Sequence, residues 1–303
     1  MPNPSNYTAV LTTFNAENTV SRALQSILNQ SLEPNEIVII DDESTDKTLA
    51  ILYKITAGNE KIKIFKTEVN TGPANSRNLG VSLSKNEFIV FFDDDDESKV
   101  SRAEIQLRDL EDSDLNYVSS EKIYSEKYKI KFINDEFRGK VNTVEFIEYL
   151  LIGNKHSKIR FSIPASALAI RRSAFDLLGG FDKTLTRLED VDLAIRAAES
   201  RLKFSFLSDI LVLRYHSVGL DKNSSNESTN QINLLNKYES RLNPRKFKQI
   251  REWYFIRKYY FNKNYLKLIF KIAYFILKYG FRKEIFLTGI NRLKHDKLIK
   301  TLS

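Results

Sequence analysis

The chain has 303 residues, of which 42% are hydrophobic and 28% charged, so it is long and apolar enough for a large folded domain plus an additional part. It contains no cysteine and three histidines, which excludes disulfides, a cysteine nucleophile and thiolate metal sites and leaves little room for a histidine-rich zinc site. The net charge of +8 is uneven: residues 243–303 carry 16 Lys and Arg against 3 Asp and Glu, and residues 1–242 carry 31 against 36. We therefore expect a neutral-to-acidic body followed by a basic part.

Residues 1–6 lack the basic start and apolar core of a signal peptide. No run of about 18 uncharged apolar residues occurs, which argues against a membrane-spanning helix. These features predict a cytoplasmic protein.

The first 92 residues alternate between strand and helix patterns. The predicted strands are 7–12, 36–40, 61–65 and 87–92, and the predicted helices are 18–29, 44–57 and 73–83. Strands separated by helices of this length indicate right-handed βαβ units, so we predict an α/β fold with a doubly wound, mainly parallel sheet. Ligand-binding loops should then follow Thr12, Ile40, Phe65 and Phe92.

The pattern after residue 100 is mixed. It predicts helices at 102–110, 143–151, 172–178 and 190–199, and strands at 115–124, 128–133, 204–207 and 210–215. Residues 221–230 (DKNSSNESTN) are polar and predict a mobile loop, and helical patterns dominate from 234 onward. We expect three parts: a catalytic domain (1–218), a mobile loop with a connecting helix (219–240) and a basic helical extension (241–303).

Four consecutive aspartates, Asp93 to Asp96, directly follow the apolar run 88–92 (FIVFF). Adjacent carboxylates repel one another unless a cation lies among them, and Mg²⁺ commonly joins one or two carboxylates to a substrate's phosphates. The alternative is a solvated acidic turn; the strand before the cluster favours a metal site.

Polar residues also follow the first two predicted strands. Thr12 and Phe14 lie in TTFN, and Asp41 and Asp42 begin DDESTD. An aspartate at a strand end can accept hydrogen bonds from a ribose or a base, whereas Ser44 and Asp46 are more simply helix caps. The chain lacks both G-x-G-x-x-G and G-x-x-x-x-G-K-[ST], which argues against a nicotinamide dehydrogenase or a P-loop NTPase.

A third polar segment is 70–78 (NTGPANSRN). Gly72 permits a tight turn, Pro73 suits a first helical turn, and Arg77 lies one turn in, where it is either solvated or faces a site.

Two carboxylates open a predicted helix at Glu189 and Asp190, after the motif GGFD. The helix dipole favours ionised carboxylates there, a useful state for a general base, although acidic residues also stabilise helix N-termini without any catalytic role.

In combination and order, these segments resemble the family 2 glycosyltransferases, which are inverting enzymes with the GT-A fold. The resemblance spans residues 7–219 and rests on six segments: 12–15 (TTFN), 41–46 (DDESTD), 70–78 (NTGPANSRN), 93–96 (DDDD), 179–182 (GGFD) and 189–193 (EDVDL).

The resemblance implies roles for these residues. The nucleotide-binding residues are Thr12, Phe14, Asp41, Asp42, Arg77, Asp93 and Asp94. The ligands of a Mn²⁺ or Mg²⁺ ion that bridges the diphosphate are Asp95, Asp93 and His216. Asp190 is the general base, and Glu189 positions the acceptor or supports Asp190.

The chain departs from processive members of the family, which carry Q-x-x-R-W near membrane helices. Here residues 249–253 (QIREW) place the arginine one position early. We therefore expect an enzyme that adds a single sugar, with Trp253 packed in a C-terminal helix.

The basic part combines apolar residues at helical spacing with lysines at 267, 271 and 278. Such a helix either lies in an anionic membrane interface or packs on the catalytic domain with solvated charges. Nucleic-acid binding is less consistent with the wide apolar face.

The sequence as a whole predicts a metal-dependent inverting transferase. Its donor would be a nucleoside-diphosphate sugar, with UDP favoured, and its acceptor a glycan or lipid-linked oligosaccharide of cell-surface polysaccharide synthesis. The alternatives are a nucleotidyltransferase, whose glycine-rich basic loop is missing, and a catalytically inactive scaffold of the same fold that is peripheral to the membrane.

Overall fold

The computed structural model describes residues 6–152, 161–215 and 224–280. The chain divides into two compact units: unit 1 comprises residues 1–143 and 157–216, and unit 2 comprises 144–156 and 217–303.

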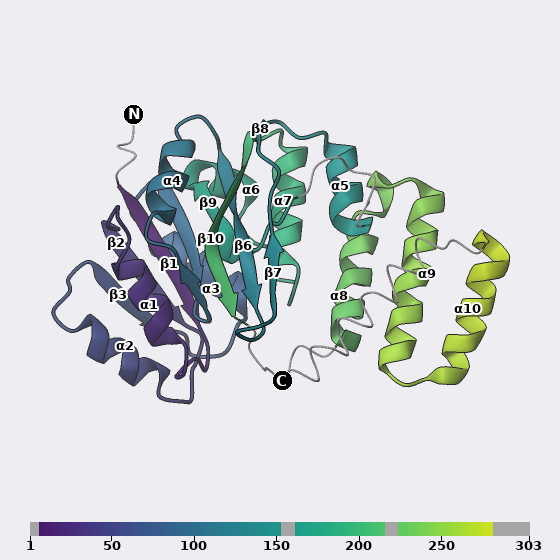
Figure 1. Ribbon diagram of the computed structural model, residues 1–303, viewed down its shortest axis with the longest axis horizontal. Coiled ribbons are helices and arrows are strands. Elements are labelled where there is room, and N and C mark those ends of the chain that lie inside the picture. Colours follow the sequence, from purple (N-terminus) through teal and green to yellow (C-terminus); the bar gives the residue numbers. More distant parts are fainter. Residues whose placement is uncertain (1–5, 153–160, 216–223, 281–303) are drawn as a thin grey trace. The chain divides into compact units, whose positions relative to one another are not determined.

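A single mixed sheet forms the centre of unit 1 (Figure 1). Its strands in the described residues are β1 (Tyr7–Thr13), β2 (Glu36–Asp41), β3 (Ile62–Lys66), β4 (Phe88–Asp93), β5 (Asp96–Ser98), β6 (Leu115–Ile123), β7 (Lys129–Phe132), β8 (Phe137–Gly139), β9 (Leu168–Arg171) and β10 (Phe204–Tyr215). They lie in the order β3-β2-β1-β4-β9-β6-β10-β5, with β7 beside β6 and β8 beside β10.

The first half of the sheet is parallel. β3, β2, β1 and β4 all run in one direction, and the apolar residues of β2, β1 and β4 are buried on both faces. The second half is mixed, because β9 runs antiparallel between β4 and β6 while β10 runs parallel to β6. The predicted α/β class is confirmed, and its parallel strands bring several carboxyl ends to one edge.

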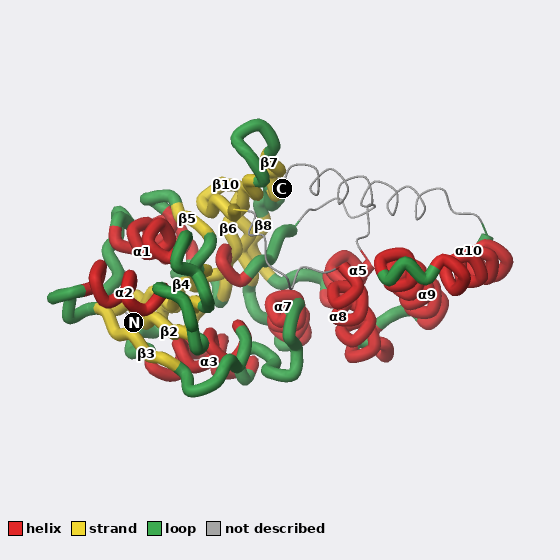
Figure 2. The backbone as a smooth tube through the Cα atoms, turned by 90° about the horizontal axis from the view of Figure 1, so that it is seen from below, coloured by secondary structure: helices red, strands yellow, loops and turns green. Residues whose placement is uncertain are grey.

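Helices cover both faces of the sheet in unit 1. They are α1 (Val20–Leu28), α2 (Thr48–Thr56), α3 (Pro73–Leu83), α4 (Arg102–Asp109), α6 (Arg172–Leu178) and α7 (Glu189–Glu199). Figure 2 shows α1 and α3 on opposite faces. Alternate residues of β1 point to opposite faces, so Leu11 joins Leu24 in the core cluster on the α1 side. Val10 faces α3, where Gly80 permits close approach: a Cβ added there would lie 2.4 Å from Val10 Cγ1.

Several predicted boundaries were wrong. The helix expected to begin at a cap, Ser44 or Thr45, begins at Thr48, because Ser44 Oγ accepts a hydrogen bond from the Asn15 N–H and the segment before Thr48 ties two loops together. The strands expected at 204–207 and 210–215 form one strand, β10, with register shifts that mark a bulge. The short strands β5, β8 and β9 were not predicted, since three or four residues carry too little pattern.

Unit 2 is helical in its described residues. Its helices are α5 (Thr143–Ile152), α8 (Ser224–Lys237), α9 (Pro244–Phe261) and α10 (Tyr265–Tyr279). The prediction of a loop at 221–230 was wrong for 224–230, which open α8; residues 221–223 lie outside the described residues. Buried apolar residues later in α8, Leu234 and Leu235, hold this helix by packing, which outweighs the low helix propensity of its serines and asparagines.

Side-chain contacts join the helices of unit 2. Arg257 of α9 donates a 2.9 Å hydrogen bond to Gln231 Oε1 of α8. Tyr254 of α9 donates a 2.7 Å bond to the Leu151 carbonyl of α5. No helix among the described residues is both long and apolar enough to cross a membrane.

Candidate active site

Most of the predicted nucleotide-binding residues lie at or just after the ends of three neighbouring parallel strands, β2, β1 and β4. In the sheet register Thr12 pairs with Asp93 on one side, and Thr13 pairs with Asp41 on the other. The loops after these strands therefore leave the sheet at one edge, as expected for a ligand site in an α/β fold.

Asp41 and Asp42 hold the loops around them. Asp41 is fully buried, and its Oδ1 accepts a 2.9 Å hydrogen bond from the Ser44 N–H. Asp42 Oδ1 accepts from the Thr71 N–H at 2.9 Å, and its Oδ2 accepts from the Gly72 N–H at 2.7 Å. Asp42 thus fixes the loop that opens α3, and its predicted contact with a nucleobase stays a prediction.

The loop after β1 is tied to both neighbouring loops. Asn15 Oδ1 accepts a 2.8 Å hydrogen bond from the Thr45 N–H, and the Phe14 N–H donates a 2.9 Å bond to Asp94 Oδ2. The Phe14 side chain is 47% exposed, so an aromatic face lies open beside the acidic turn.

The acidic turn connects β4 to β5. Asp93 ends β4, and its Oδ1 forms an ion pair with Arg77 Nη2 at 2.8 Å. Asp96 begins β5 and is buried. The main-chain carbonyl of Asp95 accepts a 2.8 Å hydrogen bond from Arg22. Within the described part of the chain, no hydrogen bond or ion pair involves the Asp95 carboxylate.

Crowding and burial change the acidity of this turn. Burial is the main cause that raises the pKa of Asp94 and of Asp96 to about 7, and neighbouring carboxylates add to it. Burial also disfavours ionised Asp93, but the Arg77 guanidinium outweighs it and holds the pKa of Asp93 below its usual value. The turn therefore combines an ionised carboxylate with others whose charge is poorly compensated.

A divalent cation fits this donor set. Oxygen-only ligands suit Mg²⁺ or Mn²⁺, and a positive charge would offset the burial and the repulsion that together raise the pKa of Asp94 and Asp96. Among the described residues, no three carboxylate or histidine side chains form a complete metal site. His216, predicted as a ligand, lies outside the described residues.

Arg77 connects the acidic turn to α7. This buried arginine lies in α3, and its two terminal nitrogens bind Asp93 Oδ1 at 2.8 Å and Glu189 Oε1 at 2.6 Å. Burial works against its charge, but the two carboxylates outweigh burial and raise the pKa of Arg77. Glu189 is itself buried, so it supports this network.

Asp190 stands in the first turn of α7, next to Glu189. It is half-buried, and its Oδ1 accepts a 2.8 Å hydrogen bond from the Val191 N–H. Burial, and then the Glu189 charge, raise the pKa of Asp190 to about 7. A carboxylate with this pKa can both accept and release a proton near neutral pH.

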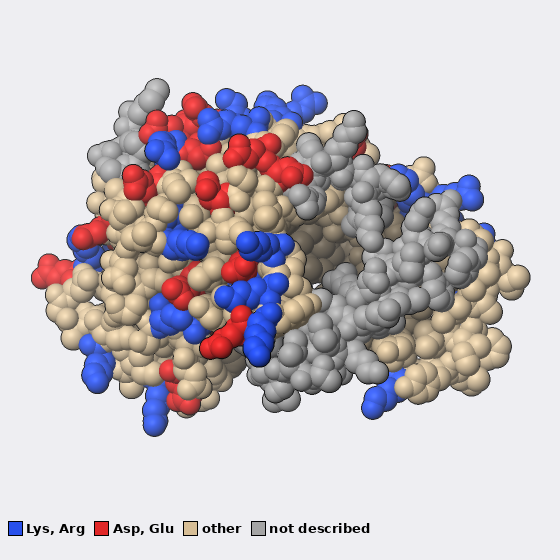
Figure 3. Space-filling view, viewed as in Figure 1, with Lys and Arg blue, Asp and Glu red and all other residues tan. Residues whose placement is uncertain are grey.

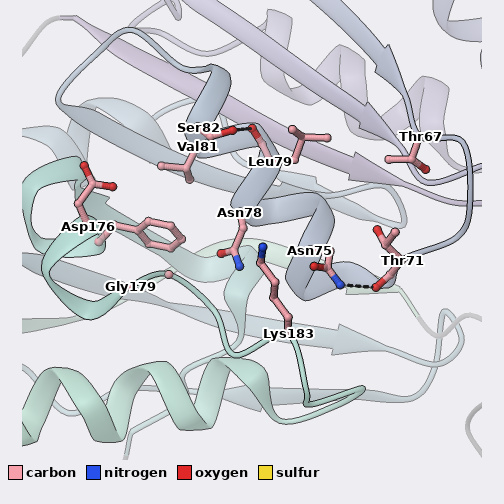
Figure 4. A pocket seen from close by; sticks show the side chains of 12 residues that line it. Thr67, Thr71, Asn75, Asn78, Leu79, Val81, Ser82, Asp176, Gly179 and Lys183 are labelled. Carbon is pink, nitrogen blue, oxygen red and sulfur yellow. Dashed lines mark hydrogen bonds between the residues drawn. The ribbon is translucent and has the colours of Figure 1, made fainter.

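The GGFD segment is fixed to α3 by Asn78, a role that the sequence did not indicate. The Asn78 side chain accepts from the Phe181 N–H at 2.8 Å and donates to the Phe181 carbonyl at 2.9 Å. A Cβ added at Gly180 would lie 2.6 Å from Asn78 Oδ1, which explains the glycine. An open pocket of about 520 Å³ lies here, between α3 and the segment that carries Lys183 (Figure 4).

Arg22 was also missed by the sequence reasoning. Its guanidinium lies 3.8 Å from the centre of the Tyr215 ring while it holds the Asp95 carbonyl. Nothing in the α1 sequence pattern distinguishes this arginine from a solvated one.

Comparison with known proteins gives a family match. The model of the family described as "Glycosyl transferase family 2" matches residues 8–178. In solved structures, S. aureus TarS 1-349 in complex with UDP-GlcNAc superposes with a TM-score of 0.62 at 18% identity, covering 92% of this chain and 82% of that one. The complex of the same protein with UDP gives a TM-score of 0.60 at 19% identity, covering 86% and 73%. At such identities, the likeness shows the shared fold.

Three curated relatives match over shorter segments. An "Uncharacterized glycosyltransferase" of Haemophilus influenzae is 37% identical over 98 residues, which is 32% of this chain and 39% of that protein. The Campylobacter jejuni "GalNAc(5)-diNAcBac-PP-undecaprenol beta-1,3-glucosyltransferase" is 34% identical over 29% of each chain. The Bacillus spizizenii "Poly(ribitol-phosphate) beta-glucosyltransferase" is 37% identical over 29% of this chain and 14% of that protein. The chain thus spans less than half the length of these relatives.

Proposed function

The chain belongs to glycosyl transferase family 2, and from this premise we propose that it transfers a single sugar from a nucleoside-diphosphate donor to an acceptor hydroxyl, with inversion at the anomeric carbon. One observation carries the proposal: Arg77 binds both Asp93 of the acidic turn and Glu189 beside Asp190. Through Arg77, the donor-side carboxylate is therefore connected to Glu189, the residue that directly precedes the candidate base in α7.

The donor is proposed to be a UDP-sugar bound at the carboxyl edge of β1, β2 and β4. The loop of Thr12 and Phe14, together with Asp41 and Asp42, faces the nucleobase, and Arg77, Asp93 and Asp94 complete the nucleotide site. Support comes from the exposed Phe14 ring beside the acidic turn and from the UDP and UDP-GlcNAc complexes of TarS, which shares the fold.

Asp95 and Asp93 are proposed to hold Mg²⁺ or Mn²⁺, with His216 as a further ligand. A bound ion supplies a Lewis acid that neutralises the charge of the leaving diphosphate. The chain's own contribution is to hold the turn: Arg22 fixes the Asp95 carbonyl, and the Phe14 N–H fixes Asp94.

Asp190 is proposed to remove the proton from the acceptor hydroxyl. The hydroxyl oxygen forms a bond to the anomeric carbon from the side opposite the diphosphate, and the bond to the diphosphate oxygen breaks with its electron pair. The proton stays on Asp190, whose pKa of about 7 suits both states. Glu189, paired with Arg77, positions the start of α7.

The acceptor class is proposed to be a glycan or lipid-linked oligosaccharide of cell-surface polysaccharide synthesis. One relative is named for an undecaprenol-diphosphate-linked acceptor and another for poly(ribitol-phosphate). An acceptor of the first kind would place the enzyme at the inner face of the cell membrane, on the cytoplasmic side.

Thermal unfolding with candidate donors tests this function. The protein is heated with UDP, GDP, CDP or dTDP, or with their sugars, in Mn²⁺, Mg²⁺ or EDTA. A ligand at 100 times its Kd stabilises the native state by about 2.7 kcal/mol, so we expect a metal-dependent rise in Tm with the UDP compounds. The Asp95→Ala variant should lose the metal-dependent part, whereas Asp112→Ala, whose exposed carboxylate serves as the control, should keep it.

Two results would contradict the proposal. If no nucleotide raised Tm, an inactive scaffold of the same fold would be favoured. If Asp95→Ala kept the full metal-dependent rise, the assignment of Asp95 would be wrong.

A further inference from the structure

Helix α10 has two apolar sides, of which only one is packed. On the packed side, Phe275 is 5% exposed, and its ring centre lies 6.4 Å from that of Trp253 in α9. Next to it, Lys271 Nζ lies 2.5 Å from Glu252 Oε2 of α9. These contacts hold α10 on α9 and fix which side faces outward.

The other side carries large exposed apolar residues. Leu266, Ile269, Phe270 and Leu277 are exposed by 71, 65, 69 and 86%. Their spacing of three, four and seven residues puts them on one side of the helix, and we call these four residues the outer face of α10. A helix that is apolar on both sides is normally buried on both, and a contiguous exposed apolar stripe marks an interaction site.

Positive charge lies beside this stripe. Lys267 and Lys278 are exposed on one flank of the outer face. Residues 244–280 contain ten Lys and Arg but only one acidic residue, Glu252. By contrast, the face of unit 1 drawn in Figure 3 carries acidic and basic side chains intermingled. The outer face of α10 therefore lies in a strongly basic segment.

The positive charge of this segment indicates what kind of partner could cover the outer face of α10. A second copy of the chain would bring two strongly basic segments together. Residues 281–303 carry six Lys and Arg against two acidic residues, so they would also add like charge. An anionic lipid surface offers both an apolar layer for the stripe and negative charge for the lysines.

We propose that the outer face of α10 docks on an anionic phospholipid surface. Leu266, Ile269, Phe270 and Leu277 enter the interface between head groups and acyl chains, and Lys267 and Lys278 meet the head groups. This surface goes beyond the proposed reaction, because it requires neither donor nor acceptor.

Vesicle sedimentation tests the proposal with the full chain. The probes are vesicles of phosphatidylcholine alone and of equimolar phosphatidylcholine and phosphatidylglycerol. The variant Ile269→Ser/Phe270→Ser/Leu277→Ser removes most of the outer face. Its matched control, Tyr53→Ser/Val100→Ser/Leu177→Ser, removes three similarly exposed residues of unit 1.

We expect binding to the anionic vesicles only, and a roughly hundred-fold weaker partition for the outer-face variant. The control should bind like the wild type. Exchanging Lys267 and Lys278 for glutamine should weaken binding about five-fold per lysine at low salt.

Three results would overturn the proposal. The first is unchanged binding by the outer-face variant. The second is a wild-type dimer in sedimentation velocity that this variant dissociates, which would identify a second copy as the occupant. The third is no vesicle binding by a monomeric wild type together with a lower Tm of the variant, which would mean that another part of the chain covers the outer face. Turnover on a soluble acceptor is measured in parallel, so that failed docking and failed catalysis are told apart.

Discussion

The candidate active site of unit 1 and helix α10 of unit 2 are unusual in opposite ways. The site buries charge: Arg77 and Glu189 are almost inaccessible, and burial raises the pKa of Asp190 to about 7. Helix α10 instead exposes apolar surface, including 69% of Phe270. Burying charge and exposing apolar surface both cost free energy in the folded protein when no ligand is bound.

This comparison separates residues that stabilise the fold from residues whose side chains are available to bind a ligand. Both terminal nitrogens of Arg77 bind protein carboxylates, whereas the Asp95 carboxylate has no hydrogen bond or ion pair among the described residues. In the same way, Phe275 is packed and Phe270 is not. Substitution should therefore change stability at the first member of each pair and binding at the second.

The largest expected effect is on turnover by Asp190→Asn. Asparagine keeps the size of the side chain but cannot accept the acceptor's proton, so kcat should fall by about 10²–10⁴-fold. Initial rates with the donor identified by thermal unfolding measure this, and Asp112→Asn serves as an exposed control. Full turnover by Asp190→Asn would remove this residue from the role of base.

Arg77→Met should have the largest effect on the stability of the fold. It leaves the buried Glu189 and the partly buried Asp93 without their partner, which costs about 3–5 kcal/mol. Urea unfolding measures the loss, and adding Glu189→Gln should restore part of it by removing one uncompensated charge. Lys61→Met breaks only an exposed pair with Glu33 and should cost less than about 1 kcal/mol. Equal losses for Arg77→Met and Lys61→Met would show that the buried network is not structural.

The two phenylalanines of α10 give a matched pair within one helix. Phe275→Ala removes a buried ring from the contact with Trp253 and should cost about 3 kcal/mol of unfolding free energy. Phe270→Ala removes an exposed ring and should change stability by about 0.5 kcal/mol or less. Urea unfolding without lipid compares them; similar losses would mean that the outer face is packed in solution.

The elements of the first half of the chain could be predicted because their signals are local. Strand β4 has a continuous apolar run, and Gly72 and Pro73 mark the start of α3, whose bounds were predicted to the residue. Strand β9 could not be predicted, since its four residues become a strand only by pairing with β4 and β6. Residues 224–230 were mistaken for a loop because the buried leucines that hold α8 come later in the sequence.

In the candidate site, too, some residues could be predicted from the local sequence and others could not. Asp93 and Asp190 were found because acidic residues at a strand end and at a helix start stand out in a sequence. Arg77, however, connects Asp93 with Glu189, the neighbour of Asp190, and no local pattern encodes a contact across 112 residues. Asn78 belongs to the polar segment 70–78, but its two hydrogen bonds to the Phe181 main chain form only because α3 packs close to the GGFD segment.

An effect smaller than that of Phe275→Ala concerns pH, which should change the stability and the activity of the protein in opposite directions. Burial and Glu189 raise the pKa of Asp190 from 3.8 to about 7, so the native state keeps a proton on Asp190 that the unfolded state releases above about pH 4. The contribution of Asp190 to stability is therefore most favourable at low pH and is lost as the pH rises toward 7. Solvent screens part of this shift, so between pH 5 and 8 wild type should lose roughly 1–2 kcal/mol more than Asp190→Asn.

Urea unfolding of both proteins at the two pH values measures this difference. The raised pKa values of Asp94 and Asp96 are common to both proteins, so their contributions cancel in the comparison. Activity should change in the opposite direction, because only ionised Asp190 accepts a proton, and kcat/KM of the wild type should rise with pH through about 7. Parallel pH profiles of stability for the two proteins would mean that Asp190 is already ionised well below pH 7, and the rising limb of activity would then belong to another group.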